Sequence, residues 1–460
     1  MHLETENAGM TIPNAGKDLA RCNEKYFSST DWWSFVLAAV IAFIGYWFSL
    51  ATDVGLENSG IYSVAAKYAG VPSPPGYPLW TIYAWLFTKL LPFSNIAWRV
   101  TVSSAVAGAL VCGVIALMTS RGSVALLAVI PNFRRLALKD EQRLRLVAGA
   151  IAGVTFGFHD EFWRSTVIVD VWPLSILLLS LVLCLLMRWT HQPENRNYFH
   201  AACFTFGLTI TNSQALIPTG LGLLFLVALT DENLGRDAAL VAGVLLIGLF
   251  AGHFLDYLPE GGRGTAETKF IIILILLTTV GLWLVLAIRT HRLRPSRTIF
   301  LGLLLFLGGT FLYLLVPIFS MTNPPVNWGY PRTLEGFFHV LSRGQFEHIM
   351  PTSSFKDFAA QMLLFAGVTM NDFGLLPTVL ALIPFGVFFR LESTQRRWLL
   401  GLSSVFVSLS FLMVALLNPP MDRQAAYLVS AYFSAASLVL ALLMGYGFVL
   451  LGTILSRPPE

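Results

Sequence analysis

Charged residues are scarce in this sequence of 460 residues, since Asp, Glu, Lys and Arg together make up only 12% of it. A soluble domain carries about twice that fraction. Hydrophobic residues reach 55%, and the mean hydropathy is +0.68. The shortage of charge excludes a soluble globular domain and predicts an all-α fold, a polytopic bundle of transmembrane helices. The basic residues lie in short loops, which indicates membrane topology and no nucleic-acid partner.

Cysteine is also scarce, and the pattern of the four cysteines excludes a metal site of the usual spacing. We expect buried free thiols, mostly within apolar runs, at Cys22, Cys112, Cys184 and Cys203. A cleavable secretory leader is not evident either. Residues 1–32 are polar and mixed in charge, so we predict that they form a cytoplasmic N-terminal segment, and no small-residue cleavage site follows the first apolar run.

Residues 33–456 are predicted to form a single polytopic membrane domain. Its basic loops, which the positive-inside rule places in the cytoplasm, are 134–145, 188–196, 289–297 and 390–397. All four lie on that side only if residues 199–230 form two short helices that turn near Asn212–Gln214. That arrangement predicts about 12 spans. The alternative, one continuous span containing Asn212 and Gln214, places every later basic loop outside.

Polar segments then gather on the outer face. They are a first outer loop at 52–97, a second polar segment at 159–170 and a further outer loop at 321–359. The sequence shows neither a soluble domain nor an internal repeat. Chemistry is therefore expected within the membrane or at its outer surface.

Two acids and an amide follow the first apolar run directly, at Asp53, Glu57 and Asn58. An acid here can act as general base on an acceptor hydroxyl, or can ligate a divalent cation with help from the amide. The alternative is a solvated loop or a helix cap. The rigid Pro/Gly-rich stretch that follows carries Tyr77 and Trp80, and we expect it to roof a pocket for a polar group that arrives from lipid.

Asp170 lies at the outer end of an apolar helix, where a carboxylate is costly unless it is paired or functional. It can face Glu57 across one pocket, or it can pair with Arg164. Asn212 and Gln214 either join two helices by hydrogen bonds or line a cavity for a lipid head group.

Arg332 opens the third outer segment, and Trp328 lies close to it in the sequence. A guanidinium suits a phosphate because its planar fork donates two hydrogen bonds at once, and an aromatic ring can stack on a sugar. The alternative is interfacial anchoring by the tryptophan, with an ion pair between Arg332 and Glu335.

Several of these segments carry a resemblance to a known family. They are Leu56–Gly60, Pro74–Leu79, Trp98–Ala105, Asp170–Trp172, Thr211–Asn212 and Asn327–Thr333. The sequence resembles bacterial membrane proteins long labelled as a domain of unknown function, whose animal members are plexin-type protein O-mannosyltransferases. The resemblance implies a GT-C glycosyltransferase of the bacterial cytoplasmic membrane with a periplasmic active face. It also implies a polyprenyl-phosphate sugar donor, a protein or lipid-linked acceptor and a catalytic acid in the first outer loop.

The sequence departs from the family pattern at four positions. Asn58 stands where the family has an acid, Ser73 and Ser213 stand where it often has His, and Asp170 replaces Glu. We predict a catalytic group of Glu57, Asn58 and Asp170, with Glu57 as the substitute base.

The competing hypothesis is an inactive membrane subunit that works with partners in a complex, because an amide cannot accept a proton as a base. A transporter is disfavoured, since inverted repeats are not evident and the polar residues gather at the outer face.

Overall fold

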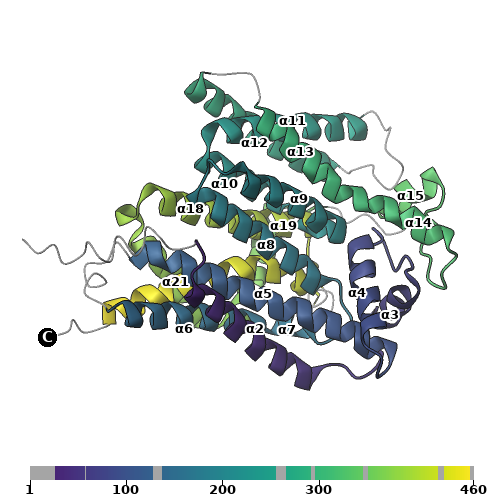
Figure 1. Ribbon diagram of the computed structural model, residues 1–460. Helices are drawn as coiled ribbons and strands as arrows, with labels where there is room; N and C mark the ends of the chain where they lie inside the picture. Colours follow the sequence, from purple (N-terminus) through teal and green to yellow (C-terminus); the bar gives the residue numbers. More distant parts are fainter. Residues whose placement is uncertain are drawn as a thin grey trace, which may run out of the picture.

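The computed structural model describes residues 26–56, 58–127, 137–254, 266–291, 296–344, 351–422 and 429–455. Figure 1 shows that these residues form a bundle of α-helices. The first helices are α2 (Ser29–Ser49), α3 (Ser59–Tyr68), α4 (Pro78–Leu90), α5 (Ile96–Leu127), α6 (Leu138–Gly157), α7 (Asp160–Thr166), α8 (Trp172–His191) and α9 (Arg196–Asn212). The others are α10 (Thr219–Thr230), α11 (Glu232–Phe254), α12 (Ala266–Thr290), α13 (Arg297–Thr310), α14 (Leu315–Met321), α15 (Leu334–Leu341), α16 (Phe355–Phe373), α17 (Leu375–Gly386), α18 (Ser393–Val407), α19 (Met413–Leu417) and α21 (Ser434–Leu455).

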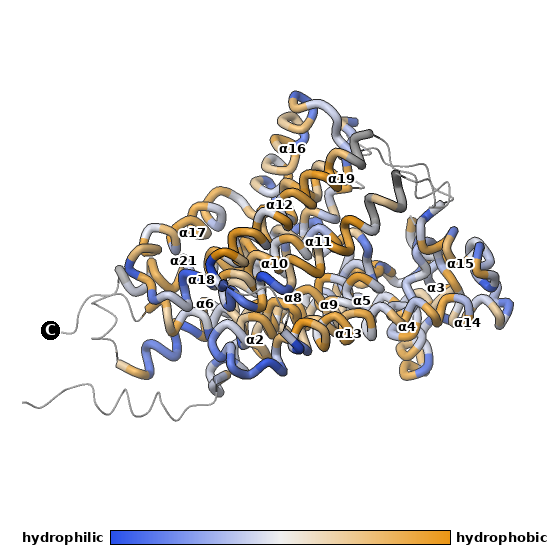
Figure 2. The backbone as a smooth tube through the Cα atoms, turned by 90° about the horizontal axis from the view of Figure 1, so that it is seen from above, coloured by the Kyte–Doolittle hydropathy of each residue, from blue (hydrophilic) through white to orange (hydrophobic). Residues whose placement is uncertain are grey.

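Seven segments of the described residues are long and apolar enough to cross a membrane, and an eighth arises if α16 and α17 form one broken span. The axes of α16 and α17 differ by 104°, at a break beside Gly374, whose φ is +78°. Figure 2 shows apolar residues along the helices and hydrophilic stretches near many of their ends. The predicted all-α polytopic membrane bundle is confirmed. The total of about 12 spans stays a prediction.

Helix α5 forms the centre of the bundle and packs against α2, α6 and α8. In its most apolar window, 89% of the residues are buried, against 22% for α2, which therefore lies at the edge. The close approach of α5 and α6 depends on Gly153, where a Cβ atom would lie 2.2 Å from the Cys112 carbonyl oxygen. Small residues commonly allow such contacts between membrane helices.

The predicted pair of short helices at 199–230 is present. Helix α9 ends at Asn212, and α10 begins at Thr219. After α10 the chain has returned to the start of α9, because Arg196 forms an ion pair with Asp231 at 2.6 Å. The single continuous span is therefore wrong, and the prediction from charge parity is confirmed.

Basic loops that are far apart in the sequence meet at one end of the bundle. Arg289 pairs with Glu232 at 3.4 Å, and Arg236 donates to the Thr290 hydroxyl at 2.9 Å. Arg397 donates to the Thr230 carbonyl at 3.5 Å. We call this the basic end.

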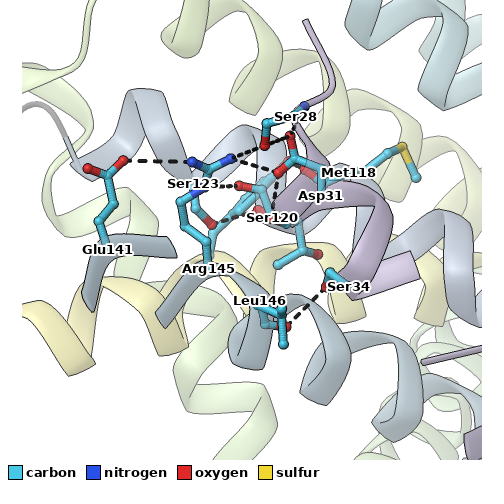
Figure 3. Close-up of polar contacts among 11 residues, drawn as sticks. Ser28, Asp31, Ser34, Met118, Ser120, Ser123, Glu141, Arg145 and Leu146 are labelled. Carbon is cyan, nitrogen blue, oxygen red and sulfur yellow. Dashed lines mark hydrogen bonds and ion pairs between the residues drawn. The ribbon is translucent and has the colours of Figure 1, made fainter. Parts of the chain in front are cut away.

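A buried network joins α2, α5 and α6 at the basic end (Figure 3). Asp31 accepts hydrogen bonds from Arg145 at 2.7 Å and from the Ser120 hydroxyl at 2.6 Å. Its other oxygen accepts from the backbone N–H and the hydroxyl of Ser28, which starts α2 with a capping box. Arg145 also lies 3.7 Å from Glu141. These contacts fix where α2, α5 and α6 meet.

Candidate functional site

Loops from three outer segments meet at the end opposite the basic end, which we call the Asp170 end. The Ala51 N–H donates to the Val167 carbonyl at 2.9 Å and so joins the first and second segments. A β-bridge between Val71 and Asn327 joins the first segment to the third. The segments predicted on the outer face are therefore neighbours in space.

Asp170 lies just before α8 and is held through its own backbone. Its carbonyl accepts hydrogen bonds from Trp80 Nε1 at 3.0 Å and from the Ser104 hydroxyl at 3.2 Å. One carboxylate oxygen accepts the Trp172 N–H at 3.1 Å, at the start of α8, where a negative charge is favourable. The residue is half-buried, so its carboxylate is oriented by the helix and is not sealed from solvent.

Aromatic side chains surround Asp170. The Tyr62 ring packs against Trp80 at 5.3 Å and against Tyr77 at 6.2 Å, and Tyr432 packs against Trp172 at 5.1 Å. Burial raises the pKa of the Tyr77 phenol to about 12, although the nearby Arg343 guanidinium lowers it. Burial also raises the pKa of Tyr62 well above its usual value. Both phenols are therefore neutral near neutral pH and can donate a hydrogen bond.

Arg343 supplies the positive charge of this cluster. It donates to the Pro74 carbonyl at 3.4 Å, so the third segment touches the Pro/Gly-rich loop. Arg343 and Asp170 both act electrostatically on the hydroxyls of Tyr77 and Tyr432. The Asp170 carboxylate and the Arg343 guanidinium therefore both influence the pKa of Tyr77, which Asp170 raises and Arg343 lowers.

Two residues of this cluster have a left-handed backbone. Tyr77 has φ of +43° and Arg343 has φ of +59°. This region is uncommon for residues other than glycine, and such conformations concentrate at ligand and catalytic sites because the surrounding structure must maintain them. Gly76, with φ of +101°, makes the turn that leads into Tyr77, and a Cβ atom there would lie 2.8 Å from Val316.

The turn between α9 and α10 lies against the same cluster. Asn212 is fully buried, and its amide nitrogen donates to the Ser175 hydroxyl at 2.8 Å and to the Val171 carbonyl at 3.3 Å. Its Oδ1 has no hydrogen-bond partner among the described residues. Gln214 donates to the Leu341 carbonyl at 3.0 Å, two residues before Arg343. Both amides join elements by hydrogen bonds, and the Asn212 oxygen makes none among the described residues.

The comparison with known proteins concerns this part of the chain. Residues 58–235 match the family model described as "Protein O-mannosyl-transferase TMEM260 N-terminal domain". These residues are related to TMEM260. The mouse protein O-mannosyl-transferase TMEM260 is 28% identical to this chain over 184 residues, which cover 39% of this chain and 23% of the mouse protein. The resemblance to the animal O-mannosyltransferases is confirmed over that region, and the chain matches about a quarter of its relative's length.

The TMEM260-related region, residues 58–235, contains most of the residues that contact Asp170. They include Trp80 and Ser104, which donate hydrogen bonds to the Asp170 carbonyl. Arg343 and Tyr432 lie outside it, so the cluster combines the related region with later parts of the chain.

Other residues predicted from the sequence lie at the surface. Asp53 is exposed and accepts from the Val54 N–H at 2.8 Å. Asn58 is exposed at the N-cap position of α3, without a capping hydrogen bond from its side chain. Glu57 lies outside the described residues, so its predicted position beside Asp170 stays a prediction.

In the third outer segment, a residue other than the predicted Trp328 and Arg332 reaches the cluster around Asp170. Trp328 is 37% exposed, and its backbone N–H donates to the Val71 carbonyl at 3.0 Å. Arg332 is exposed and stacks over the Tyr330 ring at 5.5 Å. No contact places Arg332 beside Asp170 in the described residues, whereas Arg343 reaches the cluster. In the sequence, only its position in the same outer loop as Arg332 indicated that Arg343 could belong to the site.

The sequence analysis named a divalent cation as a possible cofactor. Within the described ranges, no three His, Cys, Asp or Glu residues lie close enough to hold a metal ion. Such cations prefer several oxygen ligands, and here one carboxylate shares its surroundings with a guanidinium. The described residues around Asp170 therefore fit an anionic phosphate better than a cation.

Proposed function

We propose that this protein is an integral membrane glycosyltransferase with a GT-C-like fold. It moves a sugar from a polyprenyl-phosphate donor to a protein or lipid-linked acceptor at the outer face of the membrane. The relation of residues 58–235 to a protein O-mannosyl-transferase supports this proposal. The observation that carries it is the convergence of the three segments at the Asp170 end, where Trp80 donates to the Asp170 carbonyl and Arg343 donates to the Pro74 carbonyl of the Pro/Gly-rich loop.

The reaction is a single displacement at the anomeric carbon. The acceptor hydroxyl oxygen attacks that carbon while the Asp170 carboxylate takes the hydroxyl proton. The bond between the anomeric carbon and the phosphate oxygen breaks, and the phosphate leaves with the bonding electrons. The Arg343 guanidinium stabilises the charge that develops on the leaving oxygen, because charge-assisted hydrogen bonds strengthen as that charge grows.

The remaining residues position the donor. The aromatic residues Tyr62, Tyr77 and Trp80 form an apolar wall that excludes water and packs on the sugar face. The free Asn212 oxygen accepts a sugar hydroxyl. Trp328 and Arg332, at the exposed rim, meet the acceptor or the donor as it enters from the lipid.

Glu57 is the second candidate for the base. It directly precedes Asn58 in the first outer loop, where the family resemblance places the catalytic acid. The proposed location is the bacterial cytoplasmic membrane with the Asp170 end in the periplasm. Loops 52–97 and 321–359 then border the site from the outside.

A non-catalytic membrane subunit is the alternative. The exposed amide of Asn58, at the position of the family acid, favours it. In that case the Asp170 cluster contributes to assembly with a partner and does not turn over a donor.

The test uses the purified full chain in lipid nanodiscs with a labelled polyprenyl-phosphate mannose and a hydroxyl-bearing peptide as acceptor. We expect release of polyprenyl phosphate, and we expect Asp170→Asn to slow it by about 10²–10⁴-fold, the usual contribution of a general base. Asp53→Asn removes an exposed acid from the same end and serves as the matched control.

Two other outcomes redirect the assignment. Loss of release in Glu57→Gln with nearly normal release in Asp170→Asn moves the base to Glu57. No release by the wild type, together with a stoichiometric copurifying partner, supports the subunit.

A further inference from the structure

A second group of ionisable residues lies at the basic end, remote from Asp170. The guanidinium carbons of Arg121 and Arg188 lie 4.5 Å and 4.1 Å from the centre of the Tyr26 ring. The Tyr26 hydroxyl lies 3.2 Å from His191 Nδ1. We call these four residues the Tyr26 cluster. They join the start of the chain's first described segment to the ends of α5 and α8.

The positive charge of the Tyr26 cluster is not matched by an acid. Across the described part of the chain, neither Arg121 nor Arg188 forms an ion pair with Asp or Glu, and a buried nitrogen of Arg188, Nη1, has no hydrogen-bond partner. Two guanidinium groups held on one ring repel each other. Cation–π contacts with Tyr26, and with Tyr198 at 5.0 Å from Arg188, offset only part of that cost.

Two neighbouring arginines of the same end have an acid partner, which Arg121 and Arg188 lack among the described residues, although Nη1 of Arg196 also makes no hydrogen bond there. Arg145 lies 2.7 Å from Asp31, and Arg196 lies 2.6 Å from Asp231. These guanidinium groups therefore already have an anion within the protein. The cluster has donors of the same kind in a partly buried place, but its anion is missing from the described residues.

The surroundings place the cluster at the membrane surface. Trp32 and Trp33, in the first turn of α2, are 50% and 64% exposed. Exposed tryptophans at a helix end are typical of the layer where lipid head groups meet hydrocarbon. Basic pockets between transmembrane helices on the cytoplasmic side commonly bind anionic head groups.

We propose that the Tyr26 cluster binds the phosphate of an anionic membrane lipid in the leaflet at the basic end. The two planar forks of Arg121 and Arg188 donate to the phosphate oxygens, and Arg188 Nη1 gains the partner that it lacks. The Tyr26 ring holds both guanidinium groups at the head-group level. This site is independent of sugar transfer.

The experiment measures lipid binding to the full chain by native mass spectrometry after titration with phosphatidylglycerol or phosphatidylcholine. We expect wild type to retain phosphatidylglycerol preferentially. The double variant R121Q/R188Q should bind it about 30-fold more weakly, since each basic residue near an anionic head group contributes about fivefold. Arg143→Gln is the matched control, because its side chain is 79% exposed and lies near the start of α6.

Further arms separate the possible outcomes. Inorganic phosphate at millimolar concentration is added as a competitor. If it removes all bound phosphatidylglycerol, the site binds free phosphate and the lipid proposal is contradicted. Equal binding of the two lipids, or unchanged binding by R121Q/R188Q, would also overturn it. If that variant does not fold, R121K/R188K decides, because it keeps the charge and loses the fork. Weaker phosphatidylglycerol binding by this lysine variant supports the proposal, and wild-type binding contradicts it.

Discussion

The two ends of the bundle each contain a carboxylate and a guanidinium, but these groups are buried at one end and partly exposed at the other. At the basic end, Asp31 and Arg145 are 0% and 4% exposed, and both oxygens of Asp31 accept hydrogen bonds. At the Asp170 end, Asp170 and Arg343 are half-buried and share phenols as neighbours. The first pair is closed within the protein. Asp170 and Arg343 both stay partly exposed.

Burial is the physical reason for this difference. A charge pair removed from water is tolerated only when its geometry is good and its remaining hydrogen bonds are made. A pair that keeps some contact with water can exchange that water for substrate. Tyr77 and Arg343 have a left-handed backbone, and the Asn212 oxygen has no hydrogen-bond partner among the described residues, whereas both oxygens of Asp31 accept hydrogen bonds.

The largest expected effect comes from breaking the closed pair. Arg145→Met leaves Asp31 buried with an uncompensated charge, so the free energy of unfolding should fall by about 3–5 kcal/mol. Thermal unfolding in detergent and titration with a denaturing detergent measure it. Arg143→Met is the control, and at this exposed position we expect a change within about 0.5 kcal/mol. Equal effects of the two variants would show that the buried network does not hold α2, α5 and α6 together.

The next effect tests the open pair. Arg343→Gln should reduce sugar transfer by about 10²–10³-fold, the usual cost of removing one group that stabilises a developing oxyanion. The melting temperature should change little, because Arg343 is half-buried. Arg332→Gln removes an exposed arginine from the same segment and should lower transfer less than about threefold. The reverse order of the two variants would assign the phosphate to Arg332.

The smallest effect concerns the unpartnered amide oxygen. Asn212→Leu removes a buried amide whose nitrogen donates to Ser175 and Val171 but whose oxygen makes no hydrogen bond, so the free energy of unfolding should fall by about 1–3 kcal/mol. If Asn212 holds a sugar hydroxyl, KM for the donor should rise by about 2–12-fold with kcat nearly unchanged, as expected for one hydrogen bond. Asn197→Leu, at an exposed position of the same helix, is the control. An unchanged KM would leave Asn212 as a helix-joining residue only.

Local sequence patterns predicted the parts of the fold that depend on composition and charge. The break near Asn212–Gln214 followed from counting basic loops, and the structure has α9 and α10 on either side of it. The segments on the outer face were predicted in the same way, and they do meet at the Asp170 end.

Which individual side chains make up the site was harder to predict from the sequence. Arg332 adjoins a recognisable motif, whereas Arg343 follows α15 without any local signal. Tyr432 lies at the start of the last apolar run, far in sequence from every other member of the cluster. Its place beside Trp172 arises only when α21 packs against the central helices.

The sequence by itself determined that the chain is a helical membrane protein, because low charge and long apolar runs leave no other stable state for its backbone in lipid. It also determined which loops share a side, through the positions of Arg and Lys. Only the tertiary structure decided which arginines are paired. Arg145 pairs with Asp31 of α2 and with Glu141 of its own helix, while Arg121 and Arg188 share one tyrosine. Ion pairing depends on distances of a few ångströms between side chains from different helices, and no pattern along one chain contains those distances.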